Sequence, residues 1–253
     1  MYAPDRLTVP AAPPATHVRR RSAFFPAMAV LLLATVLAGF WNTFFFRPDS
    51  SGALALHLQI HGVAVTAWFV LFAVQSLLVA SGHTALHRQL GVTGAIVAAG
   101  VLVTSLFTLV ALVPGWRASG VDVDAQRPLL GLIIWGDLGA LAAYAVFLTR
   151  GLLLRRRSDA HRRLMLLASL SIISPALIRL SGLPVFAGVD GVLITLLGLL
   201  ALAGVLVLHD LATLRRVHRE TLWGTPFFLV VHLAPAFVVP GTALDDWLLG
   251  LVW

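Results

Sequence analysis

Seven long apolar stretches, separated by short polar segments, constrain the fold of this chain more than any other feature. A helix that crosses the hydrocarbon core of a bilayer needs about 20 mostly apolar residues, and each stretch has roughly that length. The sequence therefore predicts an all-α, polytopic membrane helix bundle with seven transmembrane helices, in a domain that covers residues 23–241. The seven stretches are residues 24–45, 54–81, 90–113, 128–149, 164–180, 189–208 and 222–239.

The composition excludes a soluble globular domain and several kinds of active site. Hydrophobic residues make up 59% of the chain and charged residues only 11%, whereas a soluble domain carries roughly 25% charged residues. The absence of cysteine excludes disulfides, thiolate metal ligands and cysteine nucleophiles. All 18 basic residues are arginine, which also excludes a lysine Schiff base.

The distribution of arginine predicts the orientation in the membrane. With the N-terminus cytoplasmic, fourteen arginines fall in inner segments and four in outer ones, and basic residues are enriched in cytoplasmic loops. We therefore expect a multi-pass protein of a bacterial inner (cytoplasmic) membrane, with its C-terminus outside. The formal net charge of +7 is then explained by the arginines of the cytoplasmic segments. The expected partner is therefore the lipid bilayer, and binding to nucleic acid is not expected. The outer arginines are Arg47, Arg117, Arg127 and Arg179.

The two ends of the chain are not expected to cross the membrane. Residues 1–22 are rich in arginine, proline and alanine, and we expect a disordered basic cytoplasmic tail there. Residues 242–253 are too short to span, and Trp247 and Trp253 are of the type that anchors a segment at the membrane interface. A short interfacial C-terminal segment is expected, and any function must lie within the bundle.

Polar side chains inside the predicted spans form a first group of candidates, because ionisable groups are costly there and mark function by default. Asp137 lies in the fourth predicted helix, His61 in the second and His232 near the middle of the seventh. A carboxyl group at that depth needs a partner, and either histidine would serve. A simple interhelical hydrogen bond would explain equally well the presence of His57, Asn42 and Gln75.

Four histidines near the predicted cytoplasmic face form a second group. His83 and His87 are four residues apart, His161 opens the fifth predicted helix and His209 closes the sixth. Histidine is the commonest metal ligand and also binds haem iron, so several histidines at one membrane level predict a cofactor site. The alternative is that they are ordinary interfacial histidines without a ligand.

Residues of the second and third predicted spans share a pattern with a known family. They are His61, Gly62, Trp68, Gln75, His87, Arg88, Gln89, Leu90 and Gly91. The pattern resembles two helices of the di-haem, ascorbate-reducible transmembrane cytochromes b. This resemblance implies that His87 and His161 are the axial ligands of one haem. It also implies an outer haem at His61, but the fourth predicted helix contains no histidine to complete that site.

A second pattern joins two distant segments. It comprises the run from His87 to Gly91 and the residues His161, Arg162, Arg163, Leu164, Met165 and Arg179. Together they resemble an uncharacterised family of bacterial multi-helix membrane proteins, in which similar histidine–arginine motifs recur.

The first functional hypothesis is a b-type cytochrome that moves electrons in the membrane. Haem b would be held by His87 and His161, and the neighbouring Arg88 and Arg162 would pair with its propionates. A quinone-type redox partner or other membrane-protein subunits would exchange electrons with it.

Two alternatives remain open from the sequence. One is a non-haem metal-dependent membrane enzyme, with zinc, iron or copper bound by the imidazoles of His83, His87, His161 and His209 and the carboxylate of Asp210. The other is a small transporter, a proton pathway or an accessory subunit of a membrane complex. The pathway residues in that case would be His61, Asp137 and His232.

Overall fold

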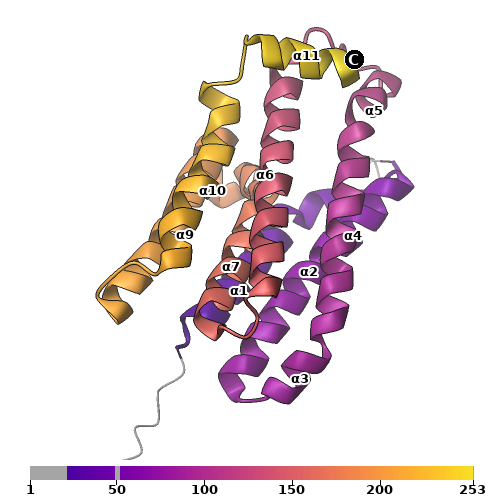
Figure 1. Cartoon of the computed structure of the whole chain (residues 1–253). Helices are drawn as coiled ribbons and strands as arrows, with labels where there is room; N and C mark the ends of the chain where they lie inside the picture. The colour runs from indigo at the N-terminus through magenta and orange to yellow at the C-terminus, as the bar shows by residue number, and fades with distance from the viewer. Residues whose placement is uncertain (1–21, 49–51, 253) are drawn as a thin grey trace, which may run out of the picture.

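The computed structural model describes residues 22–48 and 52–252, in which helices are the only regular elements. The long helices lie side by side in one bundle (Figure 1). One end of the bundle carries α3 and the other carries α11, and we call these the α3 end and the α11 end. The expected N-terminal tail falls almost entirely outside the described residues. The helices are α1 (Phe24–Gly39), α2 (Leu56–Ser81), α3 (Thr84–Gln89), α4 (Gly91–Val110), α5 (Leu112–Ala118), α6 (Arg127–Leu153), α7 (Ser158–Ser171), α8 (Ser174–Arg179), α9 (Gly191–Leu214), α10 (Arg219–Phe237) and α11 (Ala243–Val252).

Four helices are long and apolar enough to cross a membrane, namely α2, α4, α6 and α9. Helices α7 and α8 together make a fifth candidate, although they are bent by 46° at the break between them. Helix α1 is apolar but has only 16 residues, and α10 is not among the candidates. These helices support a multi-pass membrane protein, and each of the seven predicted stretches overlaps one or more helices.

The stretch 164–180 is predicted as one transmembrane helix, and the structure corrects this by dividing it between α7 and α8. Pro175 has no N–H and so leaves the carbonyl four residues earlier, that of Ser171, without its helical donor. His232 of α10 lies at this carbonyl, with its Nε2 3.0 Å from Ser171 O. Its Nδ1 lies 2.7 Å from Phe228 O, and a neutral imidazole has one N–H to donate to the two carbonyls. A side chain from another helix therefore contacts the break between α7 and α8.

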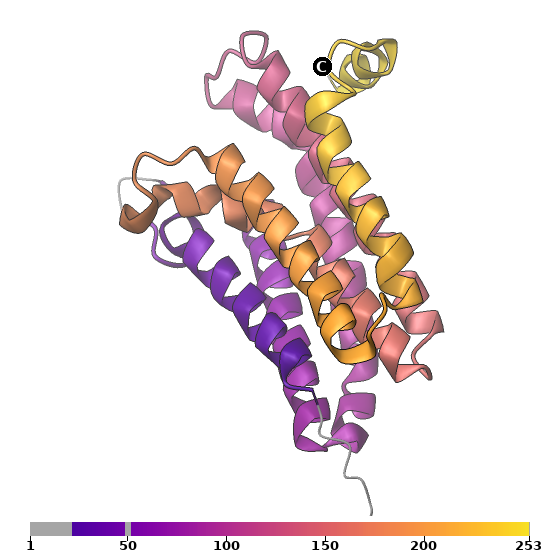
Figure 2. The same cartoon turned by 90° about the vertical axis from the view of Figure 1, so that its left-hand side faces the viewer.

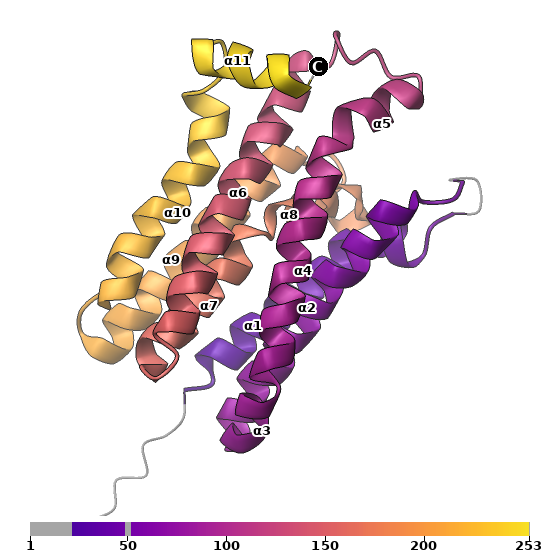
Figure 3. The same ribbon diagram turned by 45° about the vertical axis from the view of Figure 1, so that its right-hand side comes forward.

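Helix α6 lies at the centre of one half of the bundle, where it packs against α7 and α10. In the other half, α2 packs against both α1 and α4, while α8 packs against α9 (Figures 2 and 3). One apolar core runs between these helices, and its fully buried side chains include Phe69, Tyr144, Phe147, Leu167 and Phe228.

The C-terminal segment forms its own helix, α11, which lies across the end of the bundle (Figure 1). Trp135 Nε1 of α6 donates a hydrogen bond of 3.1 Å to Asp245 Oδ1, and Arg127 lies 3.8 Å from Asp246. The Trp247 side chain is exposed, as an interfacial anchor would be, while Trp253 lies outside the described residues.

The crossing of α6 and α10 depends on a glycine. A Cβ atom on Gly139 would lie 2.5 Å from the backbone oxygen of Val231, so we expect Gly139→Ala to force the two helices apart. Overpacking of this kind lowers the free energy of unfolding by about 1–3 kcal/mol. The matched control is Gly136→Ala on the same helix, where a Cβ meets nothing within 4 Å. Thermal unfolding of both variants in detergent checks this, and equal stability of the two would contradict the close crossing.

Candidate functional site

The two histidines that the sequence pairs as haem ligands lie together at the α3 end. His87 belongs to α3, the short helix in the turn between α2 and α4, and His161 lies in the first turn of α7. Their ring centroids are 6.3 Å apart and the ring planes are inclined by 73°. Two residues 74 positions apart in sequence thus meet edge to face at this end of the bundle.

The ring of His161 is held in one orientation by the preceding helix. Its Nδ1 lies 2.8 Å from the backbone oxygen of Gly151 in α6, which can only accept. Nδ1 therefore carries the proton, and Nε2 is left with a free lone pair. A hydrogen bond of this kind is what orients histidines that bind a metal in proteins.

His87 is half-buried and has a free ring nitrogen. Its Nδ1 is buried and makes no hydrogen bond with any described residue. Burial lowers the pKa of His87 below its ordinary value, and the neighbouring His161 and Arg88 act in the same direction, while the backbone of Gln75 opposes them. The imidazole is therefore neutral at neutral pH, which is the form that binds metals.

Other polar atoms on α2 and α6 are also buried without a partner among the described residues, and one of their residues, Gln75, contacts His87 through its backbone. They are Gln75 Oε1 and Trp68 Nε1 on α2 and the hydroxyl of Tyr144 on α6. The rings of Trp68 and Tyr144 meet edge to face, with centroids 5.4 Å apart. Unpaired buried polar groups are rare in proteins, and these lie on the helices that carry or adjoin the histidine pair.

The remaining histidines of the predicted metal set are engaged elsewhere. His83 Nδ1 lies 2.9 Å from Ser81 Oγ at the exposed start of α3, and the ring of His209 stacks on Phe24 at 3.9 Å. Within residues 22–48 and 52–252, no three or more histidine, aspartate or glutamate side chains gather as a metal site would require. The structure thus brings together His87 and His161 but not the set of four.

The two arginines next to the pair differ in their surroundings. Arg88 is exposed. Arg162 forms an ion pair with Asp159 and lies over the ring of Phe25 at 4.7 Å.

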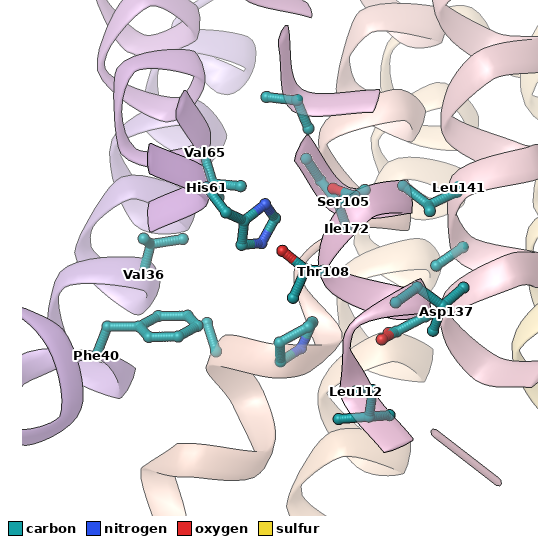
Figure 4. Close-up of a pocket in the computed structure, with 15 residues that line it drawn as sticks. Val36, Phe40, His61, Val65, Ser105, Thr108, Leu112, Asp137, Leu141 and Ile172 are labelled. Carbon is teal, nitrogen blue, oxygen red and sulfur yellow. The ribbon is translucent and has the colours of Figure 1, made fainter. Parts of the chain in front are cut away.

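The intramembrane candidates His61 and Asp137 line one cavity of ≈ 110 Å³ nearer the α11 end. Figure 4 shows the His61 ring pointing into this cavity, with the hydroxyl of Thr108 before it and Asp137 on the far side. His61 Nδ1 donates a hydrogen bond of 3.2 Å to Thr104 Oγ1, whose own proton goes to a backbone oxygen of α4. Arg179 acts on Asp137 electrostatically.

His232, the other candidate partner of Asp137, does not share that cavity. Its two ring nitrogens lie 2.7 Å from Phe228 O and 3.0 Å from Ser171 O. His61 and Asp137 line the same cavity, so the proton pathway through these two residues stays a prediction. His232 lies instead at the break between α7 and α8.

A buried ion pair at the α3 end was not foreseen from the sequence. Arg163 and Asp210 are both fully buried, and Arg163 Nε lies 2.9 Å from Asp210 Oδ1. Asp210 Oδ2 also accepts hydrogen bonds from the backbone N–H of His218 at 3.0 Å and from Thr221 Oγ1 at 2.6 Å. This network ties α7, α9 and α10 together.

The signal for this pair was present but indirect. Arg163 was counted among the arginines that set orientation, and Asp210 stands directly after an apolar run in a segment with few acids. An acid in such basic surroundings needs a partner, and the same holds for Glu220, which accepts hydrogen bonds of 2.6 and 2.9 Å from Arg150.

Comparison of the chain with protein-family models, with curated proteins and with solved structures finds no match in any of the three.

Proposed function

We propose that this chain binds one haem b between His87 and His161 and carries electrons within the membrane, as a b-type cytochrome does. The observation that carries the proposal is the pairing of these two rings, with centroids 6.3 Å apart. A metal–imidazole bond is about 2 Å long and a ring nitrogen lies about 1 Å from its ring centre. Two imidazoles that hold one iron from opposite sides have ring centres about 6 Å apart, and the spacing of this pair supports the proposal for that reason.

Haem suits this site better than a bare metal ion. Zinc and non-haem iron take three or four ligands from the protein, whereas haem iron already has four nitrogens from its own ring and needs only axial ligands. This site has two neighbouring histidines, and the described residues bring no third ligand to it. It therefore matches the need of haem iron for axial ligands alone.

The residues around the pair have separate tasks in this proposal. The Gly151 carbonyl fixes the tautomer of His161, so that Nε2 keeps the lone pair that would bind iron, and the neutral His87 would supply the second lone pair. Exposed Arg88 would pair with a propionate, while Arg162 would share its charge with Asp159. When bound, haem supplies an iron that alternates between two oxidation states.

The absorption spectrum of the purified protein tests this function. After expression with a supply of haem precursor, we expect a Soret band and a shift on reduction that is typical of two histidine ligands. Protein that is folded and pure but has no Soret band would refute the proposal.

The proposed topology has seven spans in the bacterial inner membrane, with the N-terminus and the α3 end cytoplasmic and the C-terminus outside. In support, ten of the fourteen described arginines lie in the segments at the α3 end. A quinone-type carrier or a neighbouring membrane subunit would exchange electrons with the haem in this arrangement.

Single-cysteine labelling tests the topology, since the chain has no cysteine of its own. Ser119, between α5 and α6, and Gln89, at the end of α3, are both exposed. We expect an impermeant thiol reagent to label Ser119→Cys in intact spheroplasts, and to label Gln89→Cys only after the membrane is opened. The reverse pattern would show the opposite orientation, and labelling of both in intact spheroplasts would contradict the number of spans.

A further inference from the structure

A basic cavity at the α3 end has no role in the proposed haem site. It measures ≈ 460 Å³ and lies where α6 ends and where α7 and α10 begin. Figure 2 shows the α6–α7 turn and the α9–α10 turn at the same end of the bundle. Its charged lining consists of Arg150, Arg156, Arg157, Arg219, Asp159 and Glu220.

The two acids in this lining are already neutralised. Glu220 accepts two hydrogen bonds from Arg150 and a third, of 2.7 Å, from Trp223 Nε1. Asp159 is paired with Arg162. The cavity therefore has a surplus of positive charge.

Two arginines of the lining have unused donors. The side chains of Arg156 and Arg157 make no hydrogen bond or ion pair with any residue of the described part of the chain. Arg157 is also the N-cap residue of α7, and no side chain caps that helix. The first backbone N–H groups of α7, at Ser158 and Asp159 on the cavity wall, add partial positive charge.

Leucines of α6 and α10 stand beside these charged residues in the sequence. Leu154 lines it, and the adjacent Leu153 at the end of α6 is 74% exposed, as is Leu222 in the first turn of α10 at 64%. A ligand that fits this combination has an anionic oxygen group next to a hydrocarbon portion, which describes a phospholipid and not a free phosphate ion.

We propose that this cavity binds the headgroup phosphate of an anionic phospholipid, with Arg156, Arg157 and Arg219 as its charged contacts. Bound lipid would link the α6–α7 turn to the start of α10 and fix the depth of both in the membrane.

Lipid titration of the delipidated, full-length protein in detergent tests the proposal, with native mass spectrometry as the measurement. The variant Arg156→Gln/Arg157→Gln removes two charges from the cavity. Its matched control is Arg215→Gln/Arg216→Gln, which removes two exposed arginines from the adjacent turn outside the lining. We expect the cavity variant to bind phosphatidylglycerol roughly 30-fold more weakly than the wild type, and the control to change by less than about threefold.

Three results would overturn the proposal. Equal losses in the two variants would mean that lipid responds only to overall charge. Equal affinity for phosphatidylcholine, whose phosphate is balanced by a choline cation, would mean that the site does not select an anionic headgroup. Displacement of phosphatidylglycerol by an equal concentration of inorganic phosphate would assign the site to a soluble anion. If the double variant fails to fold, Arg219→Gln must still weaken phosphatidylglycerol binding by roughly fivefold, and unchanged binding in that variant would equally refute the proposal.

Discussion

Replacement of Asp210 by alanine is expected to lower the free energy of unfolding by about 3–5 kcal/mol, because it leaves the buried guanidinium of Arg163 without a counter-charge. Both side chains are fully buried, so water cannot replace the lost carboxylate. The variant also deprives the backbone N–H of His218 and the hydroxyl of Thr221 of their acceptor. The unfolding temperature of the purified protein in detergent measures the effect.

Two further variants distinguish a buried charge pair from general disruption of the core. Thr221→Val removes one hydrogen bond to Asp210 and keeps the charges, so a cost of about 1 kcal/mol is expected. The double variant Arg163→Leu/Asp210→Leu removes both charges and should recover a large part of the stability lost in Asp210→Ala. A double variant that is less stable than the single one would contradict this account of the pair.

Replacement of His161 by alanine is expected to lower haem affinity by about 100-fold or more, since the loss of a ligand should exceed the 10- to 100-fold effect of losing a second-layer contact. Only His87 would remain to bind the iron. The hydrogen bond between the His161 ring and the Gly151 carbonyl would be lost as well. Haem content per protein after purification measures the effect, and His87→Ala should behave in the same way.

The matched controls are His83→Ala and His209→Ala. These histidines lie at the same end of the bundle, but His83 contacts Ser81 and His209 stacks on Phe24. Both variants should retain haem. If His83→Ala lost haem as fully as His161→Ala, the ligand set would have to be reassigned.

The helical segments could be predicted from the sequence because apolar length is a direct requirement of the membrane. Each of the seven stretches overlaps a helix, but only α2, α4, α6, α9 and the bent pair α7–α8 are candidate spans. Helices α6 and α9 extend to Leu153 and Leu214, beyond the apolar runs that mark them. The break at Ile172 was missed because Pro175 alone does not show that α10 brings a histidine 61 positions away to within 3.0 Å of the freed carbonyl of Ser171.

The candidate site was predicted only in part, for a similar reason. His87 and His161 could be placed at one membrane level by topology, and the structure adds that their rings meet edge to face. The grouping of His83 and His209 with them could not be judged from level alone, since side chains at one depth can point in different directions. Asp210 was proposed as a metal ligand, whereas the structure engages it with Arg163, and this pairing was missed because contact across 47 positions depends on how α7 packs against α9.

The ratio of haem to protein chain tests the central claim most directly. We predict one haem b per chain in the purified wild-type protein, from quantitative haem analysis and protein determination on the same sample, and almost none in His161→Ala. A wild-type ratio near zero despite haem supply, or a ratio of one that His161→Ala leaves unchanged, would contradict the assignment of His87 and His161 as the ligands.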